Sequence, residues 1–280
     1  MKKISVRENG LVGTLFREGS PTSAIVLLGG MSGGMNEERA ELLAQNGYTV
    51  FSLAYFGAKS LPATLNQVPL EYFEKAFQFL RSETDQIGLW GGSRGAELSL
   101  LLGTQFSDQI SAIAAHVPSS AVYGALDDYS KPAWTYRNKP IFPNAPFTYE
   151  EIASGKNVES AIASTPFFIN GMQDKEAFAK SSIPVEKIKC PLLLISAGDD
   201  QMWPSALFAN QIIDRLKEHR SQVHYTHLHY PKAGHAPAKG TVGLHPVMNR
   251  WFVYGGSEEE NAFAAKDWWE QTLNFFKERL

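Results

Sequence analysis

The five residues Gly91-Gly92-Ser93-Arg94-Gly95 constrain the fold more than any other part of the chain. They follow a short apolar segment, 87–90, and precede an amphipathic segment that begins at Ala96, so the pattern G-x-S-x-G separates a predicted strand from a predicted helix. A sharp turn at this place crowds the serine backbone, which is why glycines are needed two residues to either side. The turn lifts Ser93 to the carboxyl end of a sheet, at the N-terminus of a helix whose dipole favours negative charge. A tight turn with an incidental serine is the alternative interpretation.

Strand and helix signals alternate along the 280 residues, which is typical of an α/β fold with a mainly parallel sheet. Asn9-Gly10 predicts a hairpin between the first two strands, and Asn36 is placed to cap a helix over 37–45 that ends before Gly47. Further helices are expected around 73–80, 208–216 and 269–280. Short apolar runs predict strands at 4–7, 11–16, 24–28, 48–54, 87–90, 110–117, 192–196 and 223–230.

The stretch from about Pro118 to Pro184 breaks this rhythm, because periodicity fades while prolines and aromatic residues recur. So many aromatic residues argue against disorder, and a structureless loop of this length is uncommon inside a compact domain. We therefore expect a single domain over 1–280 with a cap of short helices inserted at about 118–184, covering one end of the sheet. Candidate substrate-binding residues are Trp134, Tyr136, Phe142 and, outside the cap, Trp203.

Composition and charge narrow the partners and the location. Lys+Arg is 26 and Asp+Glu is 29, a net charge of −3 that argues against nucleic acid and against a membrane surface as partners. No apolar run approaches the ~18 residues that a membrane span needs, and residues 1–10 lack the apolar core of a signal peptide. A cytoplasmic protein is predicted. The single cysteine, Cys190, allows no internal disulfide and is expected to be a small buried residue.

A serine hydroxyl is a weak nucleophile at neutral pH, so a base must lie beside it. In a fold of this kind the partners follow the serine in the order Ser, Asp or Glu, His. Among the seven histidines, His235 stands in a Gly-His turn directly after the predicted strand 223–230, at the same sheet edge as Ser93. His227 and His229 share one face of that strand, where a polar strand face is a simpler interpretation than a metal site.

The acid is expected directly after the strand 192–196, where Asp199 and Asp200 are neighbours. Asp200 is preferred because it lies four residues before Pro204, where the loop turns into a helix, and Asp199 is the alternative. The carboxylate would orient the imidazole and stabilise its protonated form.

Backbone donors for an oxyanion are expected in the glycine-rich run 29–34, which follows the strand 24–28. Glycines there let the backbone approach a substrate closely, and the N–H groups of Met31 and Arg94 form the predicted donor pair. The run fits neither G-x-G-x-x-G nor a P-loop, which argues against a nucleotide site. The predicted reaction requires no metal and no organic cofactor.

Several further segments carry a family resemblance, and they are densest between Ile25 and about Ser120. They include Leu28-Gly29-Gly30, Gly47-Tyr48-Thr49-Val50, Leu53-Ala54-Tyr55-Phe56, Gly92-Ser93-Arg94-Gly95-Ala96-Glu97-Leu98, Gly198-Asp199-Asp200, Trp203-Pro204-Ser205 and Gly234-His235. With these segments the chain resembles an α/β-hydrolase and, more narrowly, the C-terminal catalytic domain shared by acyl-CoA thioesterases and bile-acid-CoA:amino acid N-acyltransferases.

The resemblance implies a Ser93–Asp200–His235 triad that acts on acyl thioesters. Transferases of the family carry cysteine at the position of Ser93, so serine favours water as the acyl acceptor. The phosphates of a coenzyme A substrate would need cationic contacts, for which Lys232, Lys239, Arg137 and Lys139 are candidates, although solvated surface residues are an equally good interpretation. Two alternatives stay open: a carboxylesterase for short or aromatic esters, and a non-catalytic binding module that keeps the fold.

Overall fold

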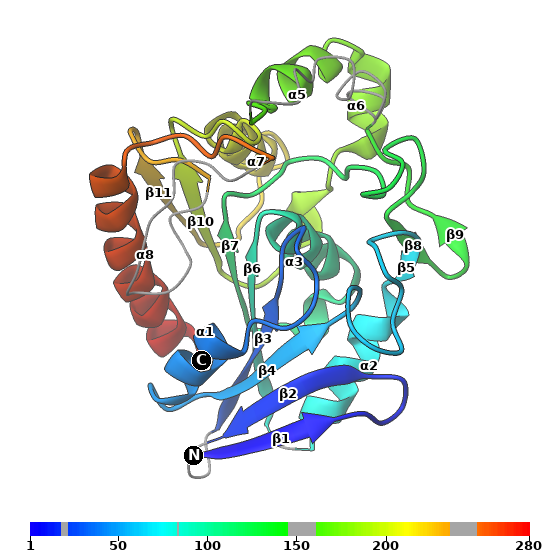
Figure 1. Cartoon of the computed structure of the whole chain (residues 1–280), viewed down its shortest axis with the longest axis vertical. Helices are drawn as coiled ribbons and strands as arrows, with labels where there is room; N and C mark the ends of the chain where they lie inside the picture. Colours follow the sequence, from blue (N-terminus) through cyan, green and yellow to red (C-terminus); the bar gives the residue numbers. More distant parts are fainter. Residues whose placement is uncertain (18–21, 83, 145–160, 236–250) are drawn as a thin grey trace.

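A computed structural model describes residues 1–17, 22–82, 84–144, 161–235 and 251–280. Its centre is an eight-stranded sheet of order β1-β2-β4-β3-β6-β7-β10-β11 (Figure 1). The strands are β1 (Lys2–Val6), β2 (Val12–Arg17), β3 (Ser23–Leu28), β4 (Thr49–Ala54), β6 (Gln86–Gly92), β7 (Ala112–His116), β10 (Leu192–Ala197) and β11 (Tyr225–Tyr230). Each of them overlaps a strand expected from the sequence.

The sheet is mostly parallel, as predicted. The six strands from β4 to β11 run parallel, whereas β1 and β2 pair antiparallel with each other and β2 pairs antiparallel with β4. The β1–β2 hairpin turns at Asn9 and Gly10, whose φ angles of 53° and 79° lie in the left-handed region that Asn-Gly adopts readily. The carboxyl ends of the parallel strands therefore meet at one edge, where the candidate side chains of the sequence analysis gather.

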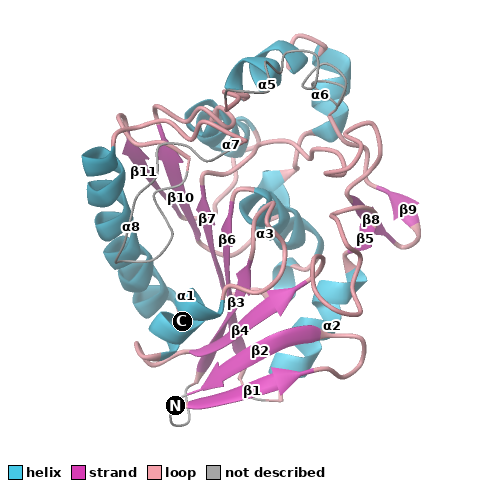
Figure 2. Ribbon diagram, in the orientation of Figure 1, coloured by secondary structure: helices cyan, strands magenta, loops and turns pink. Residues whose placement is uncertain are grey.

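Helices cover both faces of the sheet, because alternate strand residues point to opposite sides (Figure 2). On β3, for example, Ile25 and Leu27 pack into a cluster with α1 and α8, whereas Val26 and Leu28 pack with α2, α3 and α7. These helices are α1 (Glu37–Ala44), α2 (Glu71–Leu80), α3 (Arg94–Gln105), α7 (Ser205–Glu218) and α8 (Glu258–Arg279). No helix in the described part of the chain is both long and apolar enough to cross a membrane.

The stretch 118–184 contributes short elements at the carboxyl edge and beside it. Helices α5 (Thr165–Gly171) and α6 (Lys175–Ser181) lie beyond the carboxyl ends of the parallel strands (Figure 1). Strands β8 (Trp134–Tyr136) and β9 (Lys139–Pro140) join β5 (Val68–Pro69) in a small separate sheet next to α2. Residues 145–160 of this stretch lie outside the described part. Two short 3-10 helices flank the stretch, Ser107–Gln109 before it and Val185–Lys187 after it.

Candidate active site

Ser93 occupies the junction between β6 and α3 with a backbone that few residues adopt. Its φ of 57° and ψ of −122° are energetically unfavourable for any residue other than glycine, and such backbone strain is typical of functional turns. Its N–H donates to the carbonyl of His116 at 2.9 Å, which fixes the turn to β7. A Cβ on Gly91 would collide with the carbonyl of Gly95, and one on Gly95 would lie 2.5 Å from the carbonyl of Leu28. Both outer glycines of the motif are therefore required by close backbone approach.

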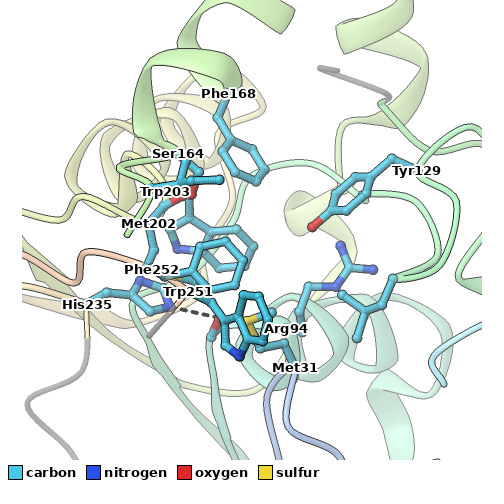
Figure 3. A pocket seen from close by; sticks show the side chains of 13 residues that line it. Met31, Arg94, Tyr129, Ser164, Phe168, Met202, Trp203, His235, Trp251 and Phe252 are labelled. Carbon is cyan, nitrogen blue, oxygen red and sulfur yellow. Dashed lines mark hydrogen bonds between the residues drawn. The ribbon is translucent and has the colours of Figure 1, made fainter. Parts of the chain in front are cut away.

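His235 reaches this serine from the loop after β11, 142 residues along the chain. Its Nε2 lies 2.9 Å from Ser93 Oγ (Figure 3). Its Nδ1 lies 2.9 and 3.0 Å from the two carboxylate oxygens of Asp200. The His235 N–H donates to the carbonyl of Tyr254, which anchors the loop. His235 and Asp200 are both buried, and with Ser93 their side chains form a continuous hydrogen-bonded row.

The structure distinguishes the two neighbouring aspartates. Asp200 Oδ1 accepts the N–H groups of Met202 at 3.0 Å and Trp203 at 3.2 Å, so these backbone donors hold the carboxylate toward His235. Asp199 points elsewhere, where it accepts from the side chain of Gln201 and from the N–H of Gly256. Asp200 is thus the residue placed beside the imidazole, and Asp199 shapes the loop.

The predicted oxyanion donors lie beside Ser93. An added Cβ on Gly30 would lie 3.2 Å from the Gly92 carbonyl and 3.5 Å from Ser93 Cβ, so the turn before Met31 packs directly on the serine turn. Within the described residues, neither the Met31 N–H nor the Arg94 N–H donates to a protein acceptor. Arg94 also begins α3, whose dipole adds to the donor strength of its amide.

A cavity of about 250 Å³ opens above Ser93 and His235. Its lining is mainly apolar and aromatic, and it comes from segments that are far apart in sequence (Figure 3). The lining residues are Met31, Ser93, Arg94, Leu126, Tyr129, Ile162, Ser164, Phe168, Met202, Trp203, His235, Trp251 and Phe252. The sequence analysis did not select Phe168, Trp251 or Phe252, although the aromatic pair ahead of the last helix was a visible signal.

Of the four aromatic residues proposed for substrate binding, the structure places only Trp203 in this lining. Trp134 is fully buried in the core, Tyr136 packs edge-on against Phe106, and the Phe142 side chain is 69% exposed. The reason is the pairing of β8 with β5, which places this part of 118–184 in the small sheet beside α2 (Figure 1), outside the cavity lining formed by the described residues. The structure therefore does not bring these three residues together with Trp203 at this cavity, and their role in substrate binding stays a prediction.

Three other described histidines, His116, His227 and His229, have side-chain partners outside the candidate site. His116 is buried, its Nε2 lies 3.0 Å from Thr272 Oγ1, and burial holds its pKa well below the usual value. His227 and His229 both lie within 3.0 Å of Ser196 Oγ, which accounts for their shared face on β11. Throughout the described ranges, no group of three His, Cys, Asp or Glu side chains is placed to hold a metal ion.

Of the cations considered for a phosphate-bearing substrate, the three within the described residues are not among those that line the cavity. Lys232 pairs with Glu260 at 3.1 Å, and the Arg137 guanidinium lies over the ring of Tyr136 in the small sheet. Lys139 belongs to β9 of the same sheet, and Lys239 lies outside the described residues.

The chain is similar in sequence to a known protein family and to curated proteins of about 30% identity. The sequence profile described as "BAAT / Acyl-CoA thioester hydrolase C terminal" matches residues 68–280. Acyl-coenzyme A thioesterase 1 of Mus musculus is 30% identical over 291 residues, and acyl-coenzyme A amino acid N-acyltransferase 1 of the same species is 30% identical over 292. Each alignment covers 100% of this chain and 66% of the relative, so the chain spans about two thirds of the length of these relatives.

Solved structures agree on the fold. An esterase from Pyrococcus furiosus superimposes with a TM-score of 0.58 at 15% identity, covering 99% of this chain and 89% of the esterase. At this identity the likeness establishes the architecture, which is the α/β-hydrolase fold expected from the sequence.

Proposed function

The chain belongs to the BAAT / acyl-CoA thioester hydrolase C-terminal family, and from this premise we propose that it is a serine hydrolase that cleaves acyl thioesters. The observation that carries the proposal is the unbroken row from Ser93 Oγ through His235 to the Asp200 carboxylate, each contact within 3.0 Å. This row opens into a mainly apolar cavity of a size suited to an acyl group.

Each residue of the row has a distinct task in the proposed mechanism. Ser93 Oγ attacks the thioester carbonyl while His235 Nε2 takes its proton, and the carbon–sulfur bond breaks as the tetrahedral intermediate collapses. The departing thiolate of the coenzyme takes the proton from His235 Nε2 and leaves as a thiol, so His235 is neutral again and the acyl group remains on Ser93 as an ester. Asp200 keeps the Nδ1–H of His235 in place and stabilises the imidazolium without taking its proton.

The second step returns the enzyme to its starting state. A water molecule gives a proton to His235 and attacks the acyl-enzyme carbonyl, which releases the carboxylic acid and restores the Ser93 hydroxyl. In both steps the developing oxyanion would be held by the Met31 and Arg94 amides, and one donor of this kind contributes about 3 kcal/mol to transition-state stabilisation. These steps use only groups of the protein, the substrate and water.

We further propose that the stretch 118–184 contributes a cap over the cavity, which within the described residues is formed by 162–171. Ile162, Ser164 and Phe168 of this stretch line the cavity, and α5 carries Phe168 over the carboxyl edge of the sheet.

The cytoplasmic location stays a prediction from the sequence, since the printed names of some curated relatives include "mitochondrial" and "peroxisomal".

A carboxylesterase is the second candidate, favoured by the aromatic lining of Phe168, Trp203 and Phe252. The same row of residues serves both reactions, because an alkoxide can replace the thiolate as leaving group. A non-catalytic binding module is the third candidate, and it predicts that Ser93 is unreactive.

A hydrolysis panel distinguishes these candidates. Purified protein is assayed with acyl-CoA thioesters and with p-nitrophenyl esters of the same acyl groups, beside Ser93→Ala and the exposed-serine control Ser82→Ala. Thioester hydrolysis that falls at least about 10⁴-fold in Ser93→Ala and persists in Ser82→Ala supports the proposal. Ester hydrolysis without thioester hydrolysis would favour the carboxylesterase. Failure of a fluorophosphonate to label Ser93 would favour the binding module.

A further inference from the structure

The first turn of α3 buries an ion pair directly behind the nucleophile turn. Arg94 and Glu97 are 3% and 0% exposed, and Arg94 Nη1 lies 2.9 Å from Glu97 Oε2. Removing two charges from water costs several kcal/mol for each ion, so such a pair persists only where further hydrogen bonds satisfy both groups. The mechanism proposed above uses the Arg94 amide but neither of these two side chains.

The partners of the pair lie in one loop, residues 123–134, which we call the wall loop. Arg94 Nη2 donates to the carbonyls of Tyr123 and Gly124, both at 2.9 Å. Glu97 Oε2 accepts the N–H of Tyr123 at 3.3 Å, and Glu97 Oε1 accepts the indole N–H of Trp134 at 2.8 Å. Glu97 therefore connects the two ends of the wall loop to each other and to α3.

The middle of the wall loop lines the cavity through Leu126 and Tyr129. Figure 3 shows Tyr129 and Arg94 on the side of the cavity that faces Trp203 and Phe168. An added Cβ on Gly124 would collide with the carbonyl of Tyr129, so the backbone at Tyr129 packs directly on the residue whose carbonyl Arg94 holds. A shift at the Arg94 contact would be passed on to the cavity wall through this close packing.

We propose that Glu97 and the Arg94 side chain are positioning residues that set the selectivity for the acyl group, because they hold the wall loop at a fixed distance from Ser93. This inference rests on the proposed function, since it assigns the cavity to the acyl group of the substrate. Glu97 lies outside the cavity lining and acts only through Arg94, Tyr123 and Trp134.

The test removes the carboxylate while keeping its shape. In Glu97→Gln one carboxylate oxygen becomes an amide NH₂, so the side chain can no longer accept from Arg94 and Tyr123 at one position and from Trp134 at the other. For each protein we compare kcat/KM of its preferred acyl thioester with kcat/KM of a thioester whose acyl chain differs by two carbons. We expect this ratio to be about tenfold smaller in Glu97→Gln than in the wild type, within the range that pocket fit contributes per methylene. Amide hydrogen exchange over 123–129 should become faster in the same variant.

A second readout does not depend on thioester turnover. A series of alkyl fluorophosphonates of increasing chain length labels a reactive serine, and the ratio of labelling rates reports how the cavity accepts each chain. Glu97→Gln should flatten this ratio, and Trp134→Phe, which removes one donor to Glu97, should flatten it less. Glu186→Gln is the matched control, because it breaks the Glu186–Arg215 pair elsewhere in the fold and should leave the ratio as in the wild type.

The outcomes separate the two proposals. Unchanged ratios in both Glu97→Gln and Trp134→Phe would overturn the inference, and so would a flattening of equal size in Glu186→Gln. A wild type that is labelled selectively but hydrolyses no thioester would overturn the proposed thioesterase while the positioning role stands. A wild type that no fluorophosphonate labels would overturn both.

Discussion

At the scale of single residues, one step along the chain separates a carboxylate that faces an imidazole from one that shapes a loop. Asp200 accepts two backbone N–H groups and contacts His235, whereas Asp199 accepts from Gln201 and Gly256. Backbone donors hold an ionised carboxylate strongly, so the orientation of Asp200 is fixed before any substrate arrives.

Replacing each aspartate by asparagine therefore has unequal consequences. Asp200→Asn removes the acceptor that selects the His235 tautomer, and we expect kcat for thioester hydrolysis to fall by about 10⁴-fold. Asp199→Asn keeps an oxygen acceptor for the loop and is expected to retain most of kcat. Steady-state kinetics of both variants check this, and a comparable loss in Asp199→Asn would count against the assignment of Asp200.

Glu97 makes the stability of the fold depend on pH. Burial raises the pKa of Glu97 from 4.5 to about 7, while Arg94 opposes the rise. A carboxyl that binds its proton more tightly when folded stabilises the folded state at acid pH, and this contribution is lost as pH rises from about 4.5 to about 7. The unfolding free energy of the wild type minus that of Glu97→Gln should therefore decrease from pH 5 to pH 8, by up to about 3 kcal/mol.

Denaturant unfolding of both proteins at several pH values measures that difference. The glutamine variant supplies the baseline, because it lacks the titrating group while all other groups are shared. A difference that increases with pH would show that Glu97 titrates below its ordinary range, contrary to the effect of burial.

At the scale of elements, the β6–α3 turn depends on close approach between backbones. A Cβ on Gly95 would lie 2.5 Å from the carbonyl of Leu28 and 2.6 Å from that of Gly29, so α3 could not keep its distance from β3. We expect Gly95→Ala to lower the thermal midpoint by several degrees and to slow labelling of Ser93.

Gly92 gives the matched control for this turn, since an added Cβ there meets nothing within 4 Å. Gly92→Ala should unfold at nearly the wild-type temperature by circular dichroism. Equal destabilisation by the two alanine variants would mean that chain flexibility, and not the contact with β3, explains the requirement for glycine.

At the scale of the whole molecule, α8 closes one face of the sheet over its 22 residues. Phe276 is fully buried, packs on Tyr48 and Trp90, and lies against the backbone of Gly88 on β6. Phe276→Ala removes a large side chain from a site that cannot collapse easily, and we expect a loss of about 3–5 kcal/mol in unfolding free energy.

Phe263 lies on the same helix but is 64% exposed, so Phe263→Ala should change the unfolding free energy by less than about 0.5 kcal/mol. Urea titrations of the two variants and the wild type make the comparison. Similar losses at both positions would indicate that helix propensity, rather than packing on the sheet, governs the contribution of α8.

The strands and the first hairpin could be predicted because their signals are local. A buried parallel strand is a short apolar run, and Asn-Gly provides the left-handed backbone that a hairpin turn needs. The strands β5, β8 and β9 were not predicted, since they have only two or three residues each and β5 pairs with β8 across 66 residues of sequence. Local periodicity contains no information about such a pairing, which is also why Trp134 was assigned to a pocket rather than to the core.

The amino-acid sequence by itself determined where the strained serine turn lies and in which order its partners follow. Steric crowding between Gly91 and Gly95 involves residues that are close in sequence, so the requirement for glycine can be recognised from the G-x-S-x-G spacing alone. Only the tertiary structure decided which aspartate meets His235 and which aromatic side chains surround Ser93. A single residue step in a loop reverses the direction of a side chain, and the cavity wall is made by packing between segments that are neighbours only after folding.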